Sequence, residues 1–466
     1  MRFNIIDQPF INQLISISGD QYVLFDNESF EKYGRDETED LLFYPEVVVI
    51  PRTPEEIAEI MKLCNTQNVP LTPRGAGTGL SGGALPINKG VLLSLERFNT
   101  IIDIDERNLQ ATIETGVITQ VFQEAVKAKG LFYPPDPSSK GSCYIGGNLA
   151  ENAGGPKAVK YGVTSDYVLN LEVVLPTGEI IWTGANVLKN ATGYNLTQLM
   201  VGSEGTLGII TKVVFSLIPH PNYDLLMLVP FYSAEEACEA VSAIFRAGII
   251  PSGMEFMERD AILCGAEYSQ SQIEIADNIK AHLLIEVDGN NMDVLYNECE
   301  TIYKVLEDFN CDEILFAEDS VQKEKLWKIR RVLGEAVKVM SVYKEEDTVV
   351  PRADLPILLK GVKKIGKEYG FTSICYGHAG DGNLHINIIK GDMSDEDWNS
   401  KLSDGIRKIF ALCVKLKGTI SGEHGIGYVQ KNYMDIPFST TELNLQKGIK
   451  KLIDPNGILN PGKVFK

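Results

Sequence analysis

The sequence is poor in histidine and has fewer basic than acidic side chains. Its 466 residues include five histidines, and 44 Lys and Arg against 63 Asp and Glu give a formal net charge of −19. Such a charge opposes attraction to nucleic acid and to anionic membrane surfaces, so we expect neither as a partner. An anionic substrate would therefore need a local positive site.

Three further features are absent from the sequence: paired cysteines, long apolar runs and a signal peptide. The eight cysteines are scattered without any C-x-x-C pair, which argues against iron–sulfur clusters and thioredoxin-like redox chemistry. No apolar run reaches about 18 residues, so we expect no membrane span. The first 20 residues are interrupted by Asp7 and Pro9 and do not resemble a signal peptide. These features predict a cytoplasmic protein.

Strand and helix patterns alternate along the chain and predict an α+β fold. In the first half, helices are expected over 52–67 and 118–130, and strands over 90–95, 110–116 and 167–179. After Pro219-His220-Pro221 a strand-then-helix pattern occurs twice, which is typical of a ferredoxin-like antiparallel sheet with helices on one face. Further helices are expected over 320–340, 354–369 and 394–417.

Three glycine-rich loops lie in the first half, at 73–84, 134–168 and 201–211. The first matches G-x-G-x-x-G from Gly77 but leads into a strand rather than a helix, which argues against a Rossmann fold. Its backbone N–H groups could turn toward a pyrophosphate, although a long hairpin turn would also explain the loop. The second loop has the length of a binding loop. Together the three loops indicate an extended ligand.

Two glycine-rich motifs in the second half carry three of the five histidines. GHAGDGNLH (377–385) supplies His378 and His385, and SGEHGIG (421–427) supplies Glu423 and His424. Two imidazoles and one carboxylate with open positions are a ligand set for Fe²⁺, Zn²⁺ or Mn²⁺, which predicts His378, His385 and Glu423 as ligands. Unrelated polar loop residues are the alternative. Asn387 would share a strand face with His385.

The combination of motifs resembles the FAD-binding domain of the vanillyl-alcohol oxidase/PCMH flavoprotein superfamily. The resemblance rests on loop 73–84, PDPSS (135–139), GGNLAENAGG (146–155) and GSEGTLGIIT (202–211), and covers about residues 45–466. It is closest to the flavin-dependent D-2-hydroxyacid dehydrogenases. It implies a two-subdomain PCMH-type FAD-binding domain (1–218), a ferredoxin-like α+β substrate domain with the metal site (219–415) and a C-terminal segment that returns to the flavin (416–466).

The resemblance also implies which residues bind FAD. The pyrophosphate would be held by Gly75, Gly77, Thr78, Gly79, Leu80, Ser81 and Gly82. The isoalloxazine and ribityl chain would be lined by Pro135, Ser138, Gly146, Gly147, Asn148, Asn152, Gly154, Gly155, Gly162 and Thr164, the adenosine half by Glu204, Gly208 and Ile210, and Asn460 would reach the flavin from the C-terminus. Loop 73–84 has no His or Cys, so noncovalent FAD is expected, with Cys143 leaving a covalent link open.

By the same resemblance, His424 would be the base that removes the substrate hydroxyl proton while hydride passes to flavin N5. The metal would act as a Lewis acid, and a neutral imidazole can accept a proton near neutral pH. Arg330 and Lys344 match positions that bind the substrate carboxylate, although both could be surface charges. His220 and His282 are interpreted as structural.

The expected activity is FAD- and metal-dependent oxidation of a D-2-hydroxy acid, with D-lactate to pyruvate as the first expectation. The D-type flavin subunit of glycolate oxidase and D-2-hydroxyglutarate dehydrogenase share every motif and remain alternatives. An ether-lipid synthase and a noncatalytic flavin electron-relay subunit are further alternatives. No second redox motif is visible, so an electron-transferring flavoprotein or an iron–sulfur subunit is expected to accept the electrons.

Overall fold

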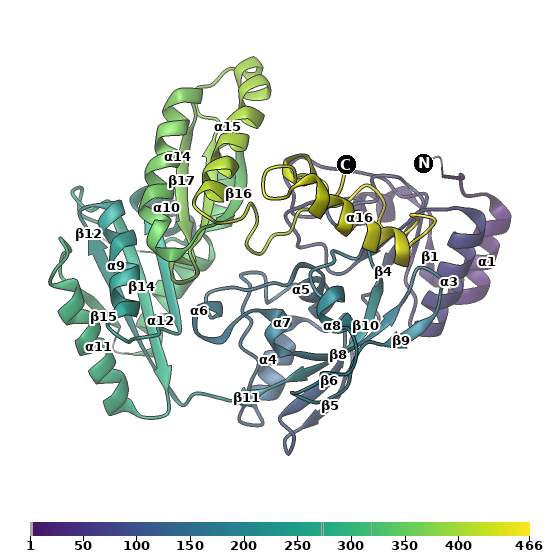
Figure 1. The fold of residues 1–466 in the computed structure, drawn as a ribbon, viewed down its shortest axis with the longest axis horizontal. Coiled ribbons are helices and arrows are strands. Elements are labelled where there is room, and N and C mark those ends of the chain that lie inside the picture. Colours follow the sequence, from purple (N-terminus) through teal and green to yellow (C-terminus); the bar gives the residue numbers. More distant parts are fainter. Residues whose placement is uncertain (1–2, 272, 274, 318) are drawn as a thin grey trace. The chain divides into compact units, whose positions relative to one another are not determined.

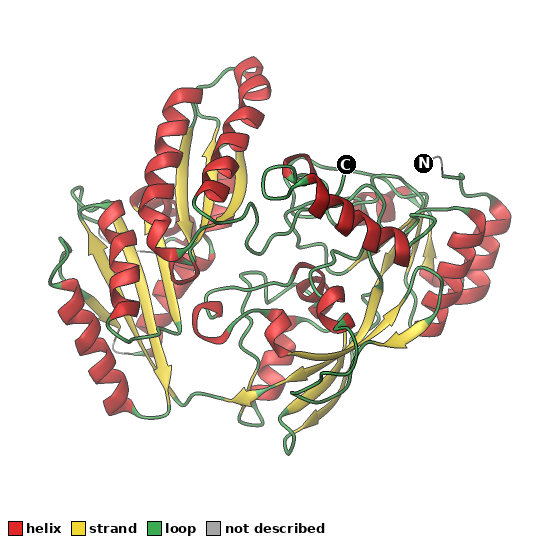
Figure 2. Ribbon diagram, in the orientation of Figure 1, coloured by secondary structure: helices red, strands yellow, loops and turns green. Residues whose placement is uncertain are grey.

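The protein consists of two compact units. The computed structural model describes residues 3–271, 273, 275–317 and 319–466 (Figure 1). Unit 1 comprises Met1–Gly154, Val163–His220 and Glu423–Lys466, and unit 2 comprises Gly155–Gly162 and Pro221–Gly422. Both contain sheets and helices (Figure 2), as the α+β prediction requires.

The first sheet of unit 1 has the strand order β1-β2-β4-β3 and is parallel except for β1. Its strands are β1 (Val23–Leu24), β2 (Val47–Val49), β3 (Leu71–Arg74) and β4 (Val91–Ser94), and nearby helices are α1 (Gln8–Ser18), α2 (Asn27–Tyr33) and α3 (Pro54–Gln67). Thr53 caps α3, because its hydroxyl accepts the Glu56 N–H at 3.2 Å. Phe10, Ile57 and Leu93 are among the residues of the apolar core between α1, α3 and the sheet.

The second sheet of unit 1 is antiparallel, with the order β5-β6-β10-β8-β9. Its strands are β5 (Ile101–Asp105), β6 (Gln110–Glu114), β8 (Val168–Val174), β9 (Ile180–Trp182) and β10 (Ile209–Ser216). Accompanying elements are α4 (Thr119–Lys127), α5 (Ile145–Glu151), α7 (Thr164–Tyr167), α8 (Leu196–Met200) and the pair β7 (Leu131–Phe132) and β11 (Ile218–Pro219). Phe122, Tyr133 and Phe215 form its aromatic core.

The C-terminal segment packs against both cores of unit 1. Helix α16 (Thr440–Ile453) places Ile449 and Ile453 against the second core, and Ile458 and Leu459 belong to the first. Leu459 also forms a parallel bridge with Leu71 of β3. The last residues of the chain therefore join the two halves of unit 1.

Unit 2 is built on a seven-stranded antiparallel sheet with the order β15-β12-β14-β13-β17-β18-β16. Its strands are β12 (Tyr223–Phe231), β13 (Gly253–Glu258), β14 (Ala281–Gly289), β15 (Leu315–Ala317), β16 (Tyr343–Val349), β17 (Thr372–Gly377) and β18 (Asn383–Ile389). The first four in space have the ferredoxin-like order, and the other three extend the sheet beyond β13. The sequence pattern predicted a ferredoxin-like antiparallel sheet but did not reveal the strand β13.

Helices cover both faces of this sheet, whereas the sequence pattern predicted one. On one face lie α9 (Ala234–Arg246), α11 (Met292–Leu306), α14 (Leu355–Tyr369) and α15 (Asp395–Lys415), and on the other α10 (Arg259–Ser269), α12 (Ser320–Arg331) and α13 (Leu333–Met340). The helix expected over 320–340 is thus two helices that meet at Val332. The signal for two layers was β14, in which Leu283, Leu284 and Ile285 follow one another, so that both faces of the strand carry apolar side chains; the strand is buried along almost its whole length. No helix among the described residues could cross a membrane.

Residues 155–162, which interrupt the second glycine loop, belong to unit 2. This segment contains α6 (Ala158–Tyr161), and Lys160 Nζ and Tyr161 Oη donate to Asp288 Oδ1 of β14 at 2.7 and 2.8 Å. Lys157 pairs with Glu286 of the same strand. Because Asp288 and Glu286 are buried, these contacts hold residues 155–162 firmly against the sheet.

His282 of β14 gives unit 2 a titratable group away from the candidate site. It is 4% exposed, and burial together with Arg259 lowers its pKa from 6.5 to about 4. The unfolded chain therefore takes up the proton first as pH falls. Stability linked to His282 should be complete above pH 6.5 and lost as pH approaches 4, a change of about 3 kcal/mol.

We expect His282→Gln to reduce the loss of stability between pH 7 and pH 4, measured as the urea midpoint by circular dichroism. His220→Gln is the matched control, since His220 is only partly buried, against Phe132, and should keep the parent's pH dependence. An unchanged acid dependence in His282→Gln would contradict the assignment.

Candidate active site

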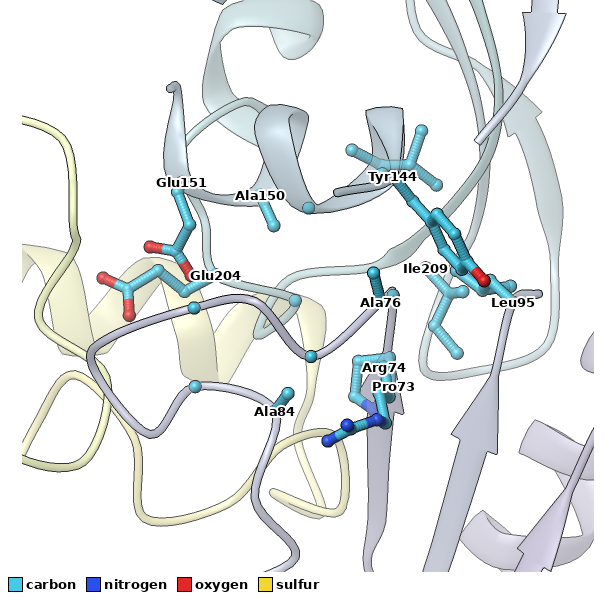
Figure 3. A pocket seen from close by; sticks show the side chains of 18 of the residues that line it. Pro73, Arg74, Ala76, Ala84, Leu95, Tyr144, Ala150, Glu151, Glu204 and Ile209 are labelled. Atoms are coloured by element: carbon cyan, nitrogen blue, oxygen red, sulfur yellow. The ribbon is translucent and has the colours of Figure 1, made fainter. Parts of the chain in front are cut away.

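Unit 1 contains a pocket between the first glycine loop, α5 and residues 203–210 (Figure 3). Of the predicted FAD residues, those that line it are Gly75, Gly77, Thr78, Gly79, Gly146, Gly147, Glu204, Gly208 and Ile210. A Cβ atom added at Gly79 or Gly147 would meet no atom within 4 Å, so the pocket wall there is bare backbone. The glycine loop and α5 therefore both offer backbone that a ligand can approach without meeting a side chain, which suits a pyrophosphate.

Arg74 lies beneath the glycine loop and was not predicted. Its guanidinium is buried, donates to the Arg35 carbonyl at 2.6 Å and lines the pocket. Gly77 has φ +79°, and a Cβ at this position would lie 1.9 Å from Arg74 Nη2, so only glycine lets the loop pass over the cation. The sequence signal for it was an arginine directly before Gly75, the first glycine of the loop. A fixed guanidinium beside bare backbone suits a phosphate group.

Two buried carboxyl groups, Glu151 and Glu204, lie side by side at one end of the pocket (Figure 3). The Glu204 carboxylate accepts the N–H groups of Ile426 and Gly427 at 2.9 and 2.5 Å. Burial raises the pKa of both groups, and the Glu204 charge raises that of Glu151 further. Glu151 is therefore the carboxyl group that keeps its proton more readily, which limits negative charge in an anion pocket.

Other predicted FAD residues support the loops in this structure. Asn148 donates to Thr119 Oγ1 at 2.6 Å, Asn152 accepts the Ser165 N–H at 2.8 Å, and Thr164 donates to the Ala153 carbonyl at 2.8 Å. Asn460 donates to the carbonyls of Gly83 and Glu204 at 3.1 and 2.9 Å. The remaining residues lie outside the pocket lining: Leu80, Ser81, Gly82, Pro135, Ser138, Gly154, Gly155 and Gly162.

In unit 2, His378 and His385 lie on either side of the turn between β17 and β18. Their ring centroids are 5.4 Å apart, and a ligand nitrogen of each lies within 4.8 Å of the other. The turn is tight: Gly382 has φ +77°, and a Cβ there would lie 1.9 Å from the Val350 carbonyl. Both imidazoles are about 4% exposed, so they could bind a metal ion away from bulk water.

The two imidazoles differ in their contacts with carboxylates. His378 Nδ1 lies 2.9 Å from both oxygens of Glu255, whereas His385 Nδ1 lies farther from its carboxylates, 3.4 Å from Glu345 and 4.0 Å from Asp347. A partner such as Glu255 is typical of a metal-binding histidine, since it orients the ring and leaves Nε2 for the ion. Burial alone would raise the pKa of Glu255, but His378 and Arg330 outweigh it and lower this pKa.

The last residues of unit 2 are held by Asp347. Its buried carboxylate accepts the Gly422 N–H at 2.7 Å, the Ser421 hydroxyl at 3.0 Å and the Asn383 amide at 2.6 Å. Glu423 and His424 are the next two residues along the chain. The start of the SGEHGIG motif is therefore anchored to the strand that pairs with His385.

Arg330, Asn387 and Lys344 occupy different positions in unit 2. Arg330 of α12 is buried, pairs with Glu255 at 2.6 Å and stacks 5.1 Å from the centre of the Tyr376 ring. Asn387 shares the strand face of His385, as predicted, and its Oδ1 is buried without a hydrogen-bond partner among the described residues. The register places Lys344 beside Ile388, on the opposite face of the sheet from Asn387.

Family models match most of the chain. The model of the FAD linked oxidases, C-terminal domain, matches residues 220–464, and that of the FAD binding domain matches residues 45–184. The chain belongs to the FAD-linked oxidases. It is therefore an FAD-dependent oxidoreductase, and most of the residues that line the pocket, Arg74 among them, lie within the stretch that matches the FAD binding domain.

Known FAD-linked oxidases are similar to this chain over nearly its whole length. Glycolate oxidase subunit GlcD of Bacillus subtilis is 38% identical over 454 residues, which cover 97% of this chain and 96% of the relative. A D-lactate dehydrogenase of Anaerostipes hadrus is 38% identical over 425 residues, covering 90% and 89%. Among solved structures, substrate-bound p-cresol methylhydroxylase has a TM-score of 0.81 at 17% identity, covering 98% and 97%, which confirms the PCMH-type fold.

The substitution Gly147→Ala tests whether FAD binds in this pocket. Alanine favours helix by up to about 1 kcal/mol over glycine, and Gly147 lies in α5 with open space around it, so the FAD-free protein should be as stable as the parent or more so. The methyl group would project into the pocket and should weaken FAD binding about tenfold or more, measured by flavin fluorescence titration.

Gly448→Ala is the matched control, because Gly448 also has open space but lies in α16, outside the pocket. It should raise the melting temperature without changing FAD affinity. Equal FAD affinity in Gly147→Ala and the parent would show that FAD does not lie against α5.

Proposed function

We propose that this chain oxidises a D-2-hydroxy acid to the 2-oxo acid using FAD and one divalent metal ion, with D-lactate as the first substrate to test. The observation that carries the proposal is the pair of buried imidazoles in unit 2, whose ring centroids are 5.4 Å apart and of which His378 has its Nδ1 2.9 Å from Glu255. The family relationship supports hydroxyacid oxidation, since similar proteins are named D-lactate dehydrogenase and glycolate oxidase subunit GlcD.

The proposed metal ligands are His378, His385 and Glu423. Two neutral imidazoles and one carboxylate suit Fe²⁺, Zn²⁺ or Mn²⁺, and the contact between His378 Nδ1 and Glu255 favours Nε2 as the donor atom of His378. The anchoring of Gly422 on Asp347 supports Glu423 as the third ligand, because Glu423 follows it directly. A bound divalent ion would supply Lewis-acid stabilisation of the substrate oxygen.

The proposed roles of the chain's own side chains follow their chemistry. Bound FAD would supply the acceptor for the hydride that leaves the substrate Cα. His424, the residue after Glu423, removes the hydroxyl proton, since a neutral imidazole is a suitable base near neutral pH.

Arg330 binds the substrate carboxylate, and its buried Nε, without a hydrogen-bond partner among the described residues, supports this role. Asn387 contacts the substrate through its unpartnered buried Oδ1. Lys344 remains a predicted second cation.

Electrons must leave the reduced flavin, and we propose an electron-transferring flavoprotein as the acceptor, with an iron–sulfur subunit as the alternative. The eight cysteines support an external acceptor: all are free thiols in the structure, and no two are spaced as a C-x-x-C pair. Rapid D-lactate-dependent reduction of oxygen by the isolated chain would contradict this part of the proposal.

Anaerobic titration of the FAD-loaded protein with D- and L-lactate, glycolate and D-2-hydroxyglutarate tests the activity. We expect D-lactate to bleach the visible absorbance of the flavin at the lowest concentration and L-lactate to leave it unchanged. Preferential bleaching by glycolate or D-2-hydroxyglutarate would assign the chain to that substrate instead. Absence of bleaching by every hydroxy acid would favour an electron-relay subunit.

Two histidine variants should separate metal binding from proton transfer. His378→Ala should lose bound metal and turnover together, whereas His424→Ala should retain FAD and metal but lose turnover by about 100-fold or more. Metal content is measured by elemental analysis and turnover with D-lactate and an artificial dye. His220→Gln is the control and should keep both. Full metal content in His378→Ala would refute its assignment as a ligand.

A further inference from the structure

Glu255 is a buried carboxylate of unit 2 that contacts two of the proposed functional side chains, His378 and Arg330. It lies on β13, the strand that the sequence pattern did not reveal, and its side chain is 0% exposed. The register of β13 with β17 pairs Met257 with Tyr376, which places Glu255 on the sheet face that carries His385 and Asn387. A fully buried carboxylate at this position needs partners that satisfy its charge.

Both partners belong to the proposed site. Glu255 Oε1 and Oε2 each lie 2.9 Å from His378 Nδ1, and Oε2 lies 2.6 Å from Arg330 Nη2. His378 comes from the turn after β17, and Arg330 from α12 on the covering helical layer. One carboxylate therefore joins two elements that are distant in sequence.

This contact determines the tautomer of His378. An ionised carboxylate only accepts hydrogen bonds, so Nδ1 must carry a proton to meet it at 2.9 Å. The ring then presents Nε2, with its lone pair, as the atom that can bind a metal ion. The His378 carbonyl accepts the N–H groups of Asp381 and Asn383 at 3.0 and 3.2 Å, which fixes the backbone from which the ring projects.

The same contact determines where the Arg330 guanidinium lies. Its Nη2 pairs with the Glu255 carboxylate at 2.6 Å, and its Cζ lies 5.1 Å from the centre of the Tyr376 ring. Nη2 is used by Glu255, while Nε is left without a hydrogen-bond partner among the described residues. A guanidinium fixed in this way has a donor to spare for a substrate carboxylate.

We propose that Glu255 is a positioning residue that orients His378 for metal binding and Arg330 for substrate binding at once. The proposal rests on the proposed function, since it assumes that His378 binds the metal and Arg330 the carboxylate. It adds a residue that couples the two binding events. Loss of Glu255 should therefore weaken both, although Glu255 itself touches neither metal nor substrate.

Glu255→Gln is the most informative variant. The amide has the shape of the carboxylate but only one acceptor oxygen, so it cannot satisfy both the His378 N–H and the guanidinium, and its NH₂ group would face one of these donors. We expect Zn²⁺ affinity of chelator-stripped, FAD-loaded protein to fall about 10- to 100-fold, measured by competition with a zinc-binding dye. At saturating Zn²⁺, the KM for D-lactate should remain raised because Arg330 has lost its partner.

Glu258→Gln is the matched control. Glu258 lies on the same strand, is largely buried and bonds to Lys363 Nζ and the Cys375 N–H, both at 2.7 Å, away from His378 and Arg330. Glu258→Gln should lower the stability of the protein, as Glu255→Gln should. Its Zn²⁺ affinity and its KM for D-lactate should stay within about threefold of the parent values. Equal effects of the two variants on Zn²⁺ affinity would reduce Glu255 to a structural carboxylate.

A measurement on the parent protein tests the proposal independently of any variant's folding. In metal-free protein with ¹⁵N-labelled histidine rings, the His378 signals, identified by their loss in His378→Ala, should show a protonated Nδ1. An unprotonated Nδ1 would overturn the proposal.

The two proposals fail in different ways. Equal Zn²⁺ binding by the parent and His378→Ala would refute the metal assignment of the proposed function. A His378-dependent Zn²⁺ site that Glu255→Gln leaves unchanged would refute only the role of Glu255.

Discussion

The structure depends on buried carboxylates that bind the backbone of glycine-rich or irregular segments. Asp347 accepts the Gly422 N–H, Glu204 accepts those of Ile426 and Gly427, and Asp454 accepts those of Ile458 and Leu459. A carboxylate removed from water needs strong donors, and an irregular segment offers N–H groups that no helix or strand uses. Each pairing satisfies both partners. Segments that would otherwise be loose are thereby held where the candidate sites need them.

The SGEHGIG motif shows the functional consequence. Its first residues are held within unit 2 by Asp347, and its last residues within unit 1 by Glu204. Glu423 and His424, the proposed metal ligand and base, lie on the short connection between these two anchored points. Both anchors are buried carboxylates, so their loss would release a proposed catalytic segment rather than a surface loop.

Much of the fold and of the candidate site could be predicted from the sequence. The helix over 54–67, the strands β4, β6 and β8 and the paired strand–helix units of unit 2 follow from apolar periodicity and capping residues. The glycine loop 73–84 and the histidine motifs were visible because their residue types are unusual and their spacing is short. The strand over 253–258 was missed because short apolar runs carry weak local signals, and the break at Val332 was missed because an isolated glycine such as Gly334 is also tolerated inside helices.

The sequence by itself determined the family, the glycine-rich loops that are predicted to bind FAD and the residue types able to bind a metal ion, since these depend on local motifs. Only the tertiary structure decided which partners each residue has. It placed Arg74 beneath the glycine loop, Lys344 on the sheet face opposite Asn387, and Glu255 between His378 and Arg330. The reason is physical: strand register and helix packing bring together residues that are far apart in the sequence, and the cost of burying a charge then decides which of them pair.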